Sequence, residues 1–236
     1  MNNKIRKYKL ILSCLSIFIV VVFITLFLYT NNETKDIIDR SQSYLKKTSN
    51  KYYLDPLIKE QNPYTVGWLK VEGTDIDYPV VQYSDNSYYL THDFYDDRNS
   101  NGWVFLDSKS KLDDSNLIIY GQFNLDGSIF GTMDELFKVG TEKEKSTKNT
   151  KNNNKIIFIT EKDYTEYTIF SGYIGTDYND YLKRNFDNMS DALKVFNDRT
   201  EVPFGEDITG VDHIITLSTI NEKDIDRMVI QGYKKK

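Results

Sequence analysis

The residues best placed to do chemistry lie near the end of the chain. Thr216, Ser218 and Thr219 close an apolar run, Ile220 follows them, and Arg227 opens a second alternating run after a short polar connection. This pattern predicts two β-strands joined by a short loop. The side chains offer hydroxyl groups, which act as nucleophiles only beside a base, and a guanidinium, which stays charged and can hold a carbonyl oxygen.

Thiols and metal-binding motifs contribute little to this chemistry. The only cysteine is Cys14, inside an apolar segment, so no disulfide can form within the chain and the rest of it has no thiol for catalysis. Cys14 is expected to pack as a small apolar side chain. The sequence contains no Walker loop, dinucleotide-binding glycine pattern, zinc spacing or EF-hand loop, and we predict no metal and no cofactor.

Several stretches of the chain resemble one family of enzymes. Gly67–Gln82, which reads GWLKVEGTDIDYPVVQ, is similar to the first two strands of class B sortases, transpeptidases that attach proteins to the Gram-positive cell wall. The similar segments that follow are residues 88–90, 92–94, 102–107 and 116–121. The last two predicted strands resemble the active-site edge of this family, where the first strand ends TLxTC and the second begins with arginine.

The resemblance implies three catalytic positions. In the family a cysteine attacks the peptide carbonyl, a histidine supplies or holds a proton, and an arginine stabilises the oxyanion. The cysteine position is Ile220 in this chain, and the histidine position of the pattern IIYGH is Gln122. Arg227 matches the arginine.

At two of these three positions the side chain cannot perform the catalytic role that the resemblance implies. Ile220 has an alkyl side chain without a nucleophile, and the amide of Gln122 donates and accepts hydrogen bonds but has no proton that titrates near neutral pH. Removing the catalytic unit of a comparable hydrolase costs on the order of 10⁶-fold in rate. We therefore expect no ordinary sortase turnover.

A neighbouring hydroxyl is the alternative nucleophile. Ser218 shares strand parity with Ile220 and should face the same side, about 7 Å further back along the strand, whereas Thr219 should face the other way. Ser218 would lack a base, since Gln122 cannot take its proton. The competing interpretation is that Ser218 lines a substrate groove, and we name Arg227, Ser218, Thr219 and Gln122 as the candidate substrate-binding residues.

The histidines and the arginine have less specific expectations. His92 lies in a segment that matches the family away from its catalytic residues, which favours a structural hydrogen-bonding role. His213 opens the penultimate strand with a parity opposite to that of Ile220, so it should point away from the groove. Arg227 could hold a peptide carbonyl, pair with an acid, or lie on the surface.

The elements that must position these residues are mostly strands. Apolar and polar residues alternate from Asn62 onward, which predicts a mostly-β domain. The resemblance implies a closed β-barrel of about eight strands with peripheral helices, one of them at 190–197. Residues 138–155 have almost no apolar content and are expected to form a solvated loop.

The amino terminus predicts a membrane anchor. Leu10–Tyr29 is an uncharged apolar segment of 20 residues, long enough to cross a hydrocarbon layer of about 30 Å as a helix. Four cations and no acid precede it, which predicts a cytoplasmic amino terminus and an extracellular domain. A cleaved signal peptide is disfavoured by the length of the segment and by the lack of a small-x-small cleavage site.

The expected organisation has four parts: a cytoplasmic terminus at 1–9, a transmembrane segment at 10–29, a helical spacer at 30–61 and a sortase-like barrel at 62–236. Of the 30 Lys and Arg residues, four precede the apolar segment, which leaves 26 against 35 Asp and Glu. This acidic exterior argues against a nucleic-acid partner.

Three hypotheses for function follow. The chain is a sortase homologue in the cell membrane without transpeptidase activity, which binds sorting-signal peptides or a partner sortase. Alternatively, it is an active sortase with a displaced nucleophile such as Ser218. The third possibility is a structural surface domain whose groove is filled.

Overall fold

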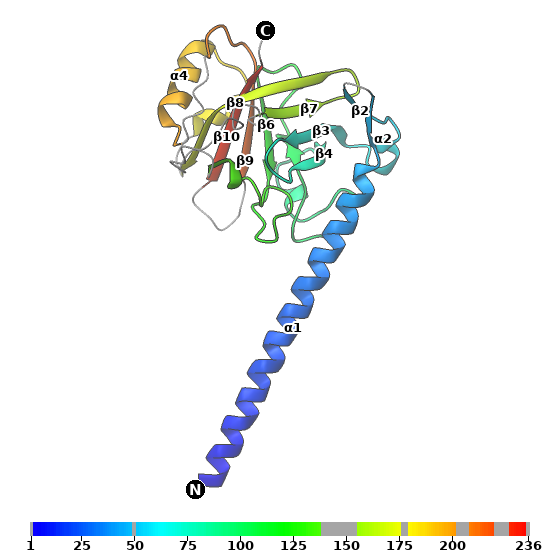
Figure 1. Ribbon diagram of the computed structural model, residues 1–236, viewed down its shortest axis with the longest axis vertical. Coiled ribbons are helices and arrows are strands. Elements are labelled where there is room, and N and C mark those ends of the chain that lie inside the picture. The colour runs from blue at the N-terminus through cyan, green and yellow to red at the C-terminus, as the bar shows by residue number, and fades with distance from the viewer. Residues whose placement is uncertain are drawn as a thin grey trace, which may run out of the picture.

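The computed structural model describes residues 2–48, 51–137, 155–175, 179–201, 208–219 and 227–234 (Figure 1). Two features expected from the sequence fall outside these ranges. They are Ile220 and the loop expected at 138–155, of which only Lys155 is described.

The amino-terminal helix α1 spans Asn2–Gln42 and extends away from the rest of the molecule, with the amino terminus at its far end (Figure 1). Its length and composition would allow it to cross a membrane. Beyond the apolar segment the same helix continues onto the barrel, where Thr34, Ile37 and Ser41 are buried. The helix is uninterrupted because the first proline in the chain is Pro56 and no glycine precedes it.

The spacer expected to be helical at 30–61 is helical in part, since α1 continues through it to Gln42, but a hairpin follows before the next helical turn. Strands β1 (Leu45–Lys47) and β2 (Tyr52–Leu54) pair as an antiparallel hairpin, and α2 (Ile58–Gln61) is a single turn. Asp55 and Pro56 separate the hairpin from α2, because a proline disfavours helical backbone at the residue before it.

Eight strands close into a barrel in the order β10-β8-β7-β3-β4-β5-β6-β9, as the resemblance implied. Closure gives each of these eight strands a neighbour on both sides. The barrel strands are β3 (Thr65–Val71), β4 (Asp77–Val81), β5 (Phe105–Leu106), β6 (Asn116–Gly121), β7 (Lys155–Ile159), β8 (Tyr164–Gly175), β9 (Ile214–Thr219) and β10 (Arg227–Lys234).

Three neighbouring strands form the part of the barrel that carries the candidate site. Strands β6 and β9 run parallel, with Tyr120 opposite Ser218 and Gly121 opposite Thr219. Strand β10 returns antiparallel to β9, with Val229 opposite Ser218. The last residues of β6 and β9 and the first residues of β10 therefore lie at one end of the barrel.

Helical pieces cover the outside. The 3-10 helices η1 (Tyr88–Leu90) and η2 (Asn179–Leu182) lie in connections, and α4 (Met189–Arg199) confirms the helix expected at 190–197. Asn188 caps α4 by accepting a hydrogen bond from the backbone N–H of Asp191 at 3.3 Å. Leu193 and Phe196 are buried against the barrel, which fixes η2 and α4 beside β8 and β9.

Candidate functional site

The candidate site lies where β6, β9 and β10 meet at one end of the barrel. Gln122 directly follows β6, Thr219 ends β9, and Arg227 begins β10. The backbone N–H of Met228 donates to Oγ1 of Thr219 at 2.9 Å, which ties the start of β10 to the end of β9. Three of the residues singled out in the sequence are therefore neighbours in space.

The side chain of Gln122 is held by main-chain oxygens. Its Nε2 donates to the carbonyl oxygen of Leu90 at 2.5 Å and to that of Ser100 at 3.3 Å. The main-chain carbonyl oxygen of Gln122 accepts from the N–H of Phe130 at 3.0 Å. The side-chain amide of Gln122 therefore joins the end of β6 to the segment that runs from η1 to β5. At this position the side chain has a structural role.

Gly102 makes this close approach possible. Its φ is +62°, and a Cβ there would lie 2.6 Å from the carbonyl oxygen of Tyr89 and 2.9 Å from Nε2 of Gln122. Both the left-handed backbone and the missing side chain are needed, because real Cβ atoms do not approach other atoms so closely. The contact between Gln122 and this segment thus depends on glycine at 102.

Ser218 faces outward from the barrel but is fully buried. Its Oγ lies 3.2 Å from Oη of Tyr181 in η2 and also donates to the carbonyl oxygen of Thr219 at 3.3 Å. Thr219 is 5% exposed, and its hydroxyl accepts the bond from Met228. The Thr219 hydroxyl joins β9 to β10, whereas the Ser218 hydroxyl contacts η2, and neither is presented to solvent. Substrate binding by either residue stays a prediction.

A buried phenol lies beside Ser218. Tyr120, the cross-strand partner of Ser218, donates its hydroxyl to Oδ2 of Asp107 at 3.4 Å. Burial raises the pKa of Tyr120 and the negative charge of Asp107 adds to this, whereas the positive charge of Arg227 lowers it. The phenol therefore stays protonated at neutral pH and cannot act as a base.

Asp107 connects this cluster to neighbouring segments. Its Oδ2 accepts from Nδ2 of Asn86 at 2.7 Å, and its Oδ1 lies 3.7 Å from Nη1 of Arg184. Sequence reasoning missed Tyr120, Tyr181 and Asp107 as members of the site. Tyr120 could have been identified, since it directly precedes Gly121 in the segment 116–121 that resembles the family, but the other two come from connections whose placement the sequence does not determine.

Arg227 is half-buried and pairs with Gly175 at the end of β8. Its positive charge lowers the pKa of the Tyr120 phenol. Among the four residues predicted to bind substrate, Arg227 and Gln122 are thus the two with partly exposed side chains.

The two histidines lie apart from Ser218. His92 stacks on Tyr88 with ring centroids 4.0 Å apart, and its Nδ1 lies 2.9 Å from the carbonyl oxygen of Tyr88, in agreement with the structural role expected for it. His213 precedes β9 and its Nδ1 lies 3.0 Å from Oδ1 of Asp212. Since Ser218 is near the other end of β9, His213 is not placed to serve it as a base.

Within the described ranges, no group of three or more His, Cys, Asp or Glu side chains is arranged to hold a metal ion.

The chain resembles known proteins in both sequence and fold. No protein-family model matches the chain. It is 30% identical over 226 residues to sortase B of Listeria monocytogenes, which covers 87% of this chain and 86% of that protein. It is 28% identical over 172 residues to sortase B of Staphylococcus aureus, which covers 70% of this chain and 66% of that protein. A crystal structure of a sortase B in complex with triglycine superposes with a TM-score of 0.67 at 26% identity, covering 76% of this chain and 84% of that one.

Proposed function

This chain belongs to the sortase B family, and from that premise we propose that it is a membrane-anchored member that has lost the cysteine transpeptidase reaction and acts by binding peptides. The apolar part of α1 anchors the protein, with residues 1–9 in the cytoplasm and the barrel of residues 62–236 outside the cell. The partner is a sorting-signal peptide of a surface protein or an active sortase.

One observation carries the loss of activity. The family's cysteine position is Ile220, and the only cysteine in the chain is Cys14, which lies in the apolar segment of α1. Thiolate attack on a peptide carbonyl therefore has no source in the barrel. Gln122 supports the proposal, because its amide is committed to the carbonyl oxygens of Leu90 and Ser100 and has no proton to exchange near neutral pH.

Ser218 does not provide a substitute nucleophile in this proposal. Its side chain is fully buried, its hydroxyl contacts Tyr181, and the nearest strand partner, Tyr120, keeps its proton because burial raises its pKa. A serine needs both access to the substrate and a base. Ser218 has neither among these neighbours.

Peptide binding is supported by what remains at the end of the barrel. The half-buried guanidinium of Arg227 can donate two hydrogen bonds to a peptide carbonyl, and Gln122 is also partly exposed. Since a relative of this chain was solved in complex with triglycine, oligoglycine is a rational second probe beside sorting-signal peptides.

The activity half of the proposal is tested by incubating purified full-length protein with sorting-signal peptides and with diaminopimelate or oligoglycine acceptors. Mass spectrometry should detect neither cleavage nor an acyl-enzyme. A covalent adduct on any side chain would overturn the proposal, and an adduct abolished by Ser218→Ala would establish the displaced-nucleophile alternative.

The binding half is tested with the same peptides by titration calorimetry. Arg227→Gln should weaken binding about tenfold or more, because a hydrogen bond to a charged group contributes about 1.5–3 kcal/mol. Arg199→Gln, at the end of α4, is the matched control and should bind as the wild type does. Absence of binding to the wild type would favour the structural domain with a filled groove.

Restoration of the lost side chains separates an intact groove from a filled one. The double variant Gln122→His, Ile220→Cys should form an acyl-enzyme with a sorting-signal peptide if the groove is intact. If the double variant folds but forms no adduct, the groove does not admit a peptide.

A further inference from the structure

Helix α1 is fastened to the barrel immediately beyond its apolar segment. The hydroxyl of Thr34, which is 1% exposed, accepts hydrogen bonds from Nδ2 of Asn99 at 3.3 Å and from Nδ2 of Asn101 at 3.1 Å. Nδ2 of Asn101 also donates to Oδ2 of Asp126 at 3.0 Å. The loop after β6 and the segment before β5 are therefore bound to the same turn of the helix.

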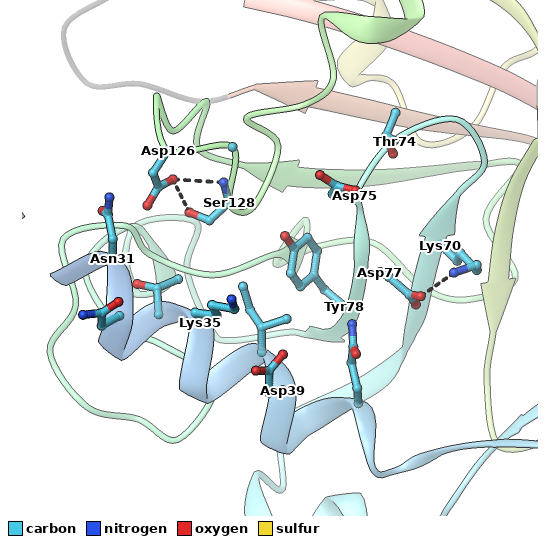
Figure 2. Close-up of a pocket in the computed structure, with 15 residues that line it drawn as sticks. Asn31, Lys35, Asp39, Lys70, Thr74, Asp75, Asp77, Tyr78, Asp126 and Ser128 are labelled. Carbon is cyan, nitrogen blue, oxygen red and sulfur yellow. Dashed lines mark hydrogen bonds and ion pairs between the residues drawn. The ribbon is translucent and has the colours of Figure 1, made fainter. Parts of the chain in front are cut away.

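The contact extends one turn closer to the apolar segment. With its amide oriented by its partners, Asn31 donates to Oδ2 of Asp126 at 2.9 Å. Figure 2 shows Asp126 and Ser128 on the barrel loop opposite Asn31 on the helix, at one end of a cleft of about 730 Å³ between α1 and the barrel.

This attachment determines how far the loop lies from the bilayer. A helix rises about 1.5 Å per residue, so Asn31 lies about 3 Å and Thr34 about 7.5 Å beyond Tyr29, the last residue of the apolar segment. The headgroup region adds about 5–7 Å on each side of the hydrocarbon core. Asp126, bonded to Asn31, is therefore held at headgroup depth when the apolar segment spans a membrane.

Leu125, next to Asp126, is the most exposed large apolar side chain in the described part of the barrel, with 92% of its surface accessible. Both neighbours of Leu125 form hydrogen bonds that hold the loop in the conformation that exposes it. Nδ2 of Asn124 donates to the carbonyl oxygen of Asn101 at 3.1 Å, and Oδ1 of Asp126 accepts from the hydroxyl of Ser128 at 2.7 Å. A leucine side chain exposed to water contributes no apolar burial to the stability of the barrel.

We infer that Leu125 inserts into the headgroup region of the bilayer and that the loop Asn124–Ser128 is a membrane-docking surface of the barrel. The inference rests on the membrane anchoring proposed above. An apolar side chain at this depth gains from leaving water. Because Gln122 lies only three residues before Leu125, docking also places the candidate site at the membrane-facing end of the barrel.

A site-specific fluorophore tests the inference in the full-length protein, reconstituted as single copies in nanodiscs of phosphatidylcholine and phosphatidylglycerol. Leu125→Cys in a Cys14→Ser background provides one thiol for an environment-sensitive label. Leu112→Cys in the same background is the matched control, since Leu112 is also exposed, at 48%, but lies before β6, at the opposite end of that strand.

The label at position 125 should emit at shorter wavelength than the label at 112, should be quenched by lipids with a nitroxide headgroup, and should be protected from aqueous iodide. Equal iodide quenching at both positions would overturn the inference. A protein partner for Leu125 would give this same overturning result, because each disc holds one copy of the chain and no other protein.

Native Cys14, labelled in the otherwise unaltered chain, distinguishes the two possible failures. If the label on Cys14 reports an apolar environment while the label at 125 reports water, only the docking inference fails. If Cys14 itself reports water, the anchoring proposal fails and the docking inference fails with it.

Discussion

Replacement of Gln122 should reveal whether its amide holds the end of β6 to the segment between η1 and β5. Gln122→Ala removes the hydrogen bonds to the carbonyl oxygens of Leu90 and Ser100. Each hydrogen bond contributes about 0.5–1.5 kcal/mol net, and the longer bond to Ser100 belongs to the low end, so the loss should be about 1–2 kcal/mol. For a chain of this size that corresponds to a fall in melting temperature of about 2–8 °C.

Gln122→Glu is the sharper perturbation because it keeps the shape of the side chain. At neutral pH it replaces a donor by a carboxylate oxygen facing two carbonyl oxygens, so it should destabilise more than alanine does. The pKa of the new carboxyl should be raised in the folded state, since only its protonated form can donate to these oxygens. The folded state then binds a proton more tightly than the unfolded state, so the deficit should be full above the folded pKa and should shrink as the pH falls toward about 4.

Urea unfolding followed by tryptophan fluorescence provides the assay, because Trp68 and Trp103 are both buried and are the two tryptophans of the chain. Gln61→Glu, at the exposed end of α2, is the matched control and should change the free energy of unfolding by less than about 0.5 kcal/mol. If Gln122→Ala and Gln122→Glu both unfold as the wild type does at neutral pH, the amide does not hold these segments together. A pH-independent deficit in Gln122→Glu would refute the acceptor-against-acceptor explanation.

Three further substitutions test other parts of the same region by unfolding. Gly102→Ala should lower the free energy of unfolding by more than about 2 kcal/mol, because the φ of Gly102 is +62° and a Cβ there would meet main-chain oxygen atoms. Gly210→Ala is the control and should cost less, because Gly210 has a similar φ of +71° but a Cβ there would meet no other atom. Asn116→Ala should lower the free energy of unfolding by about 3 kcal/mol or more, because the side chain of Asn116 donates to the carbonyl oxygens of Tyr181 and Lys183 and accepts from the hydroxyl of Thr216. It should also speed hydrogen exchange in β9. A loss below about 1 kcal/mol would contradict this reasoning. Asp93→Asn should be more stable than the wild type at neutral pH, because burial raises the pKa of Asp93 and the ionised carboxylate destabilises the folded state above that pKa. The difference in stability should vanish as the pH falls below about 4. A difference that grows on acidification would refute the explanation.

The architecture was largely predictable from the sequence, and most of that came from resemblance. Alternation of apolar residues indicates strands, but only the match of long segments such as Gly67–Gln82 predicted eight strands closed into a barrel. The apolar helix was evident from composition. Helix was expected after this segment, and α1 does continue to Gln42, because no proline or glycine interrupts it. The β1–β2 hairpin was not predicted, because it depends on tertiary packing of Leu45, Tyr52 and Leu54 against the main core.

The candidate site was predictable only as far as strand ends. The matched motifs identify Gln122 and Arg227, and the strand pairing brings them to the same end of the barrel. Strand parity predicts that Ser218 faces the same side as Ile220, which lies outside the described residues, and parity cannot show whether another segment covers the side chain. Tyr181, which covers Ser218, is 37 residues away in a connection whose path depends on tertiary contacts.

The bonds that hold this end of the barrel do not involve the two side chains that the family uses for chemistry. The parallel ladder of β6 and β9, the bond from Met228 to Thr219 and the buried contact of Thr216 with Asn116 all persist without a thiol or an imidazole. This strand arrangement therefore does not depend on a thiol or an imidazole at positions 220 and 122, and Gln122 adds a contact of its own, from Nε2 to the carbonyl oxygen of Leu90. Introducing histidine at 122 should therefore cost stability, because a neutral imidazole has one N–H donor, whereas the amide of Gln122 donates to both Leu90 and Ser100. The single variant Ile220→Cys should then retain more stability than the double variant, and only the double variant should combine a nucleophile with a titratable partner.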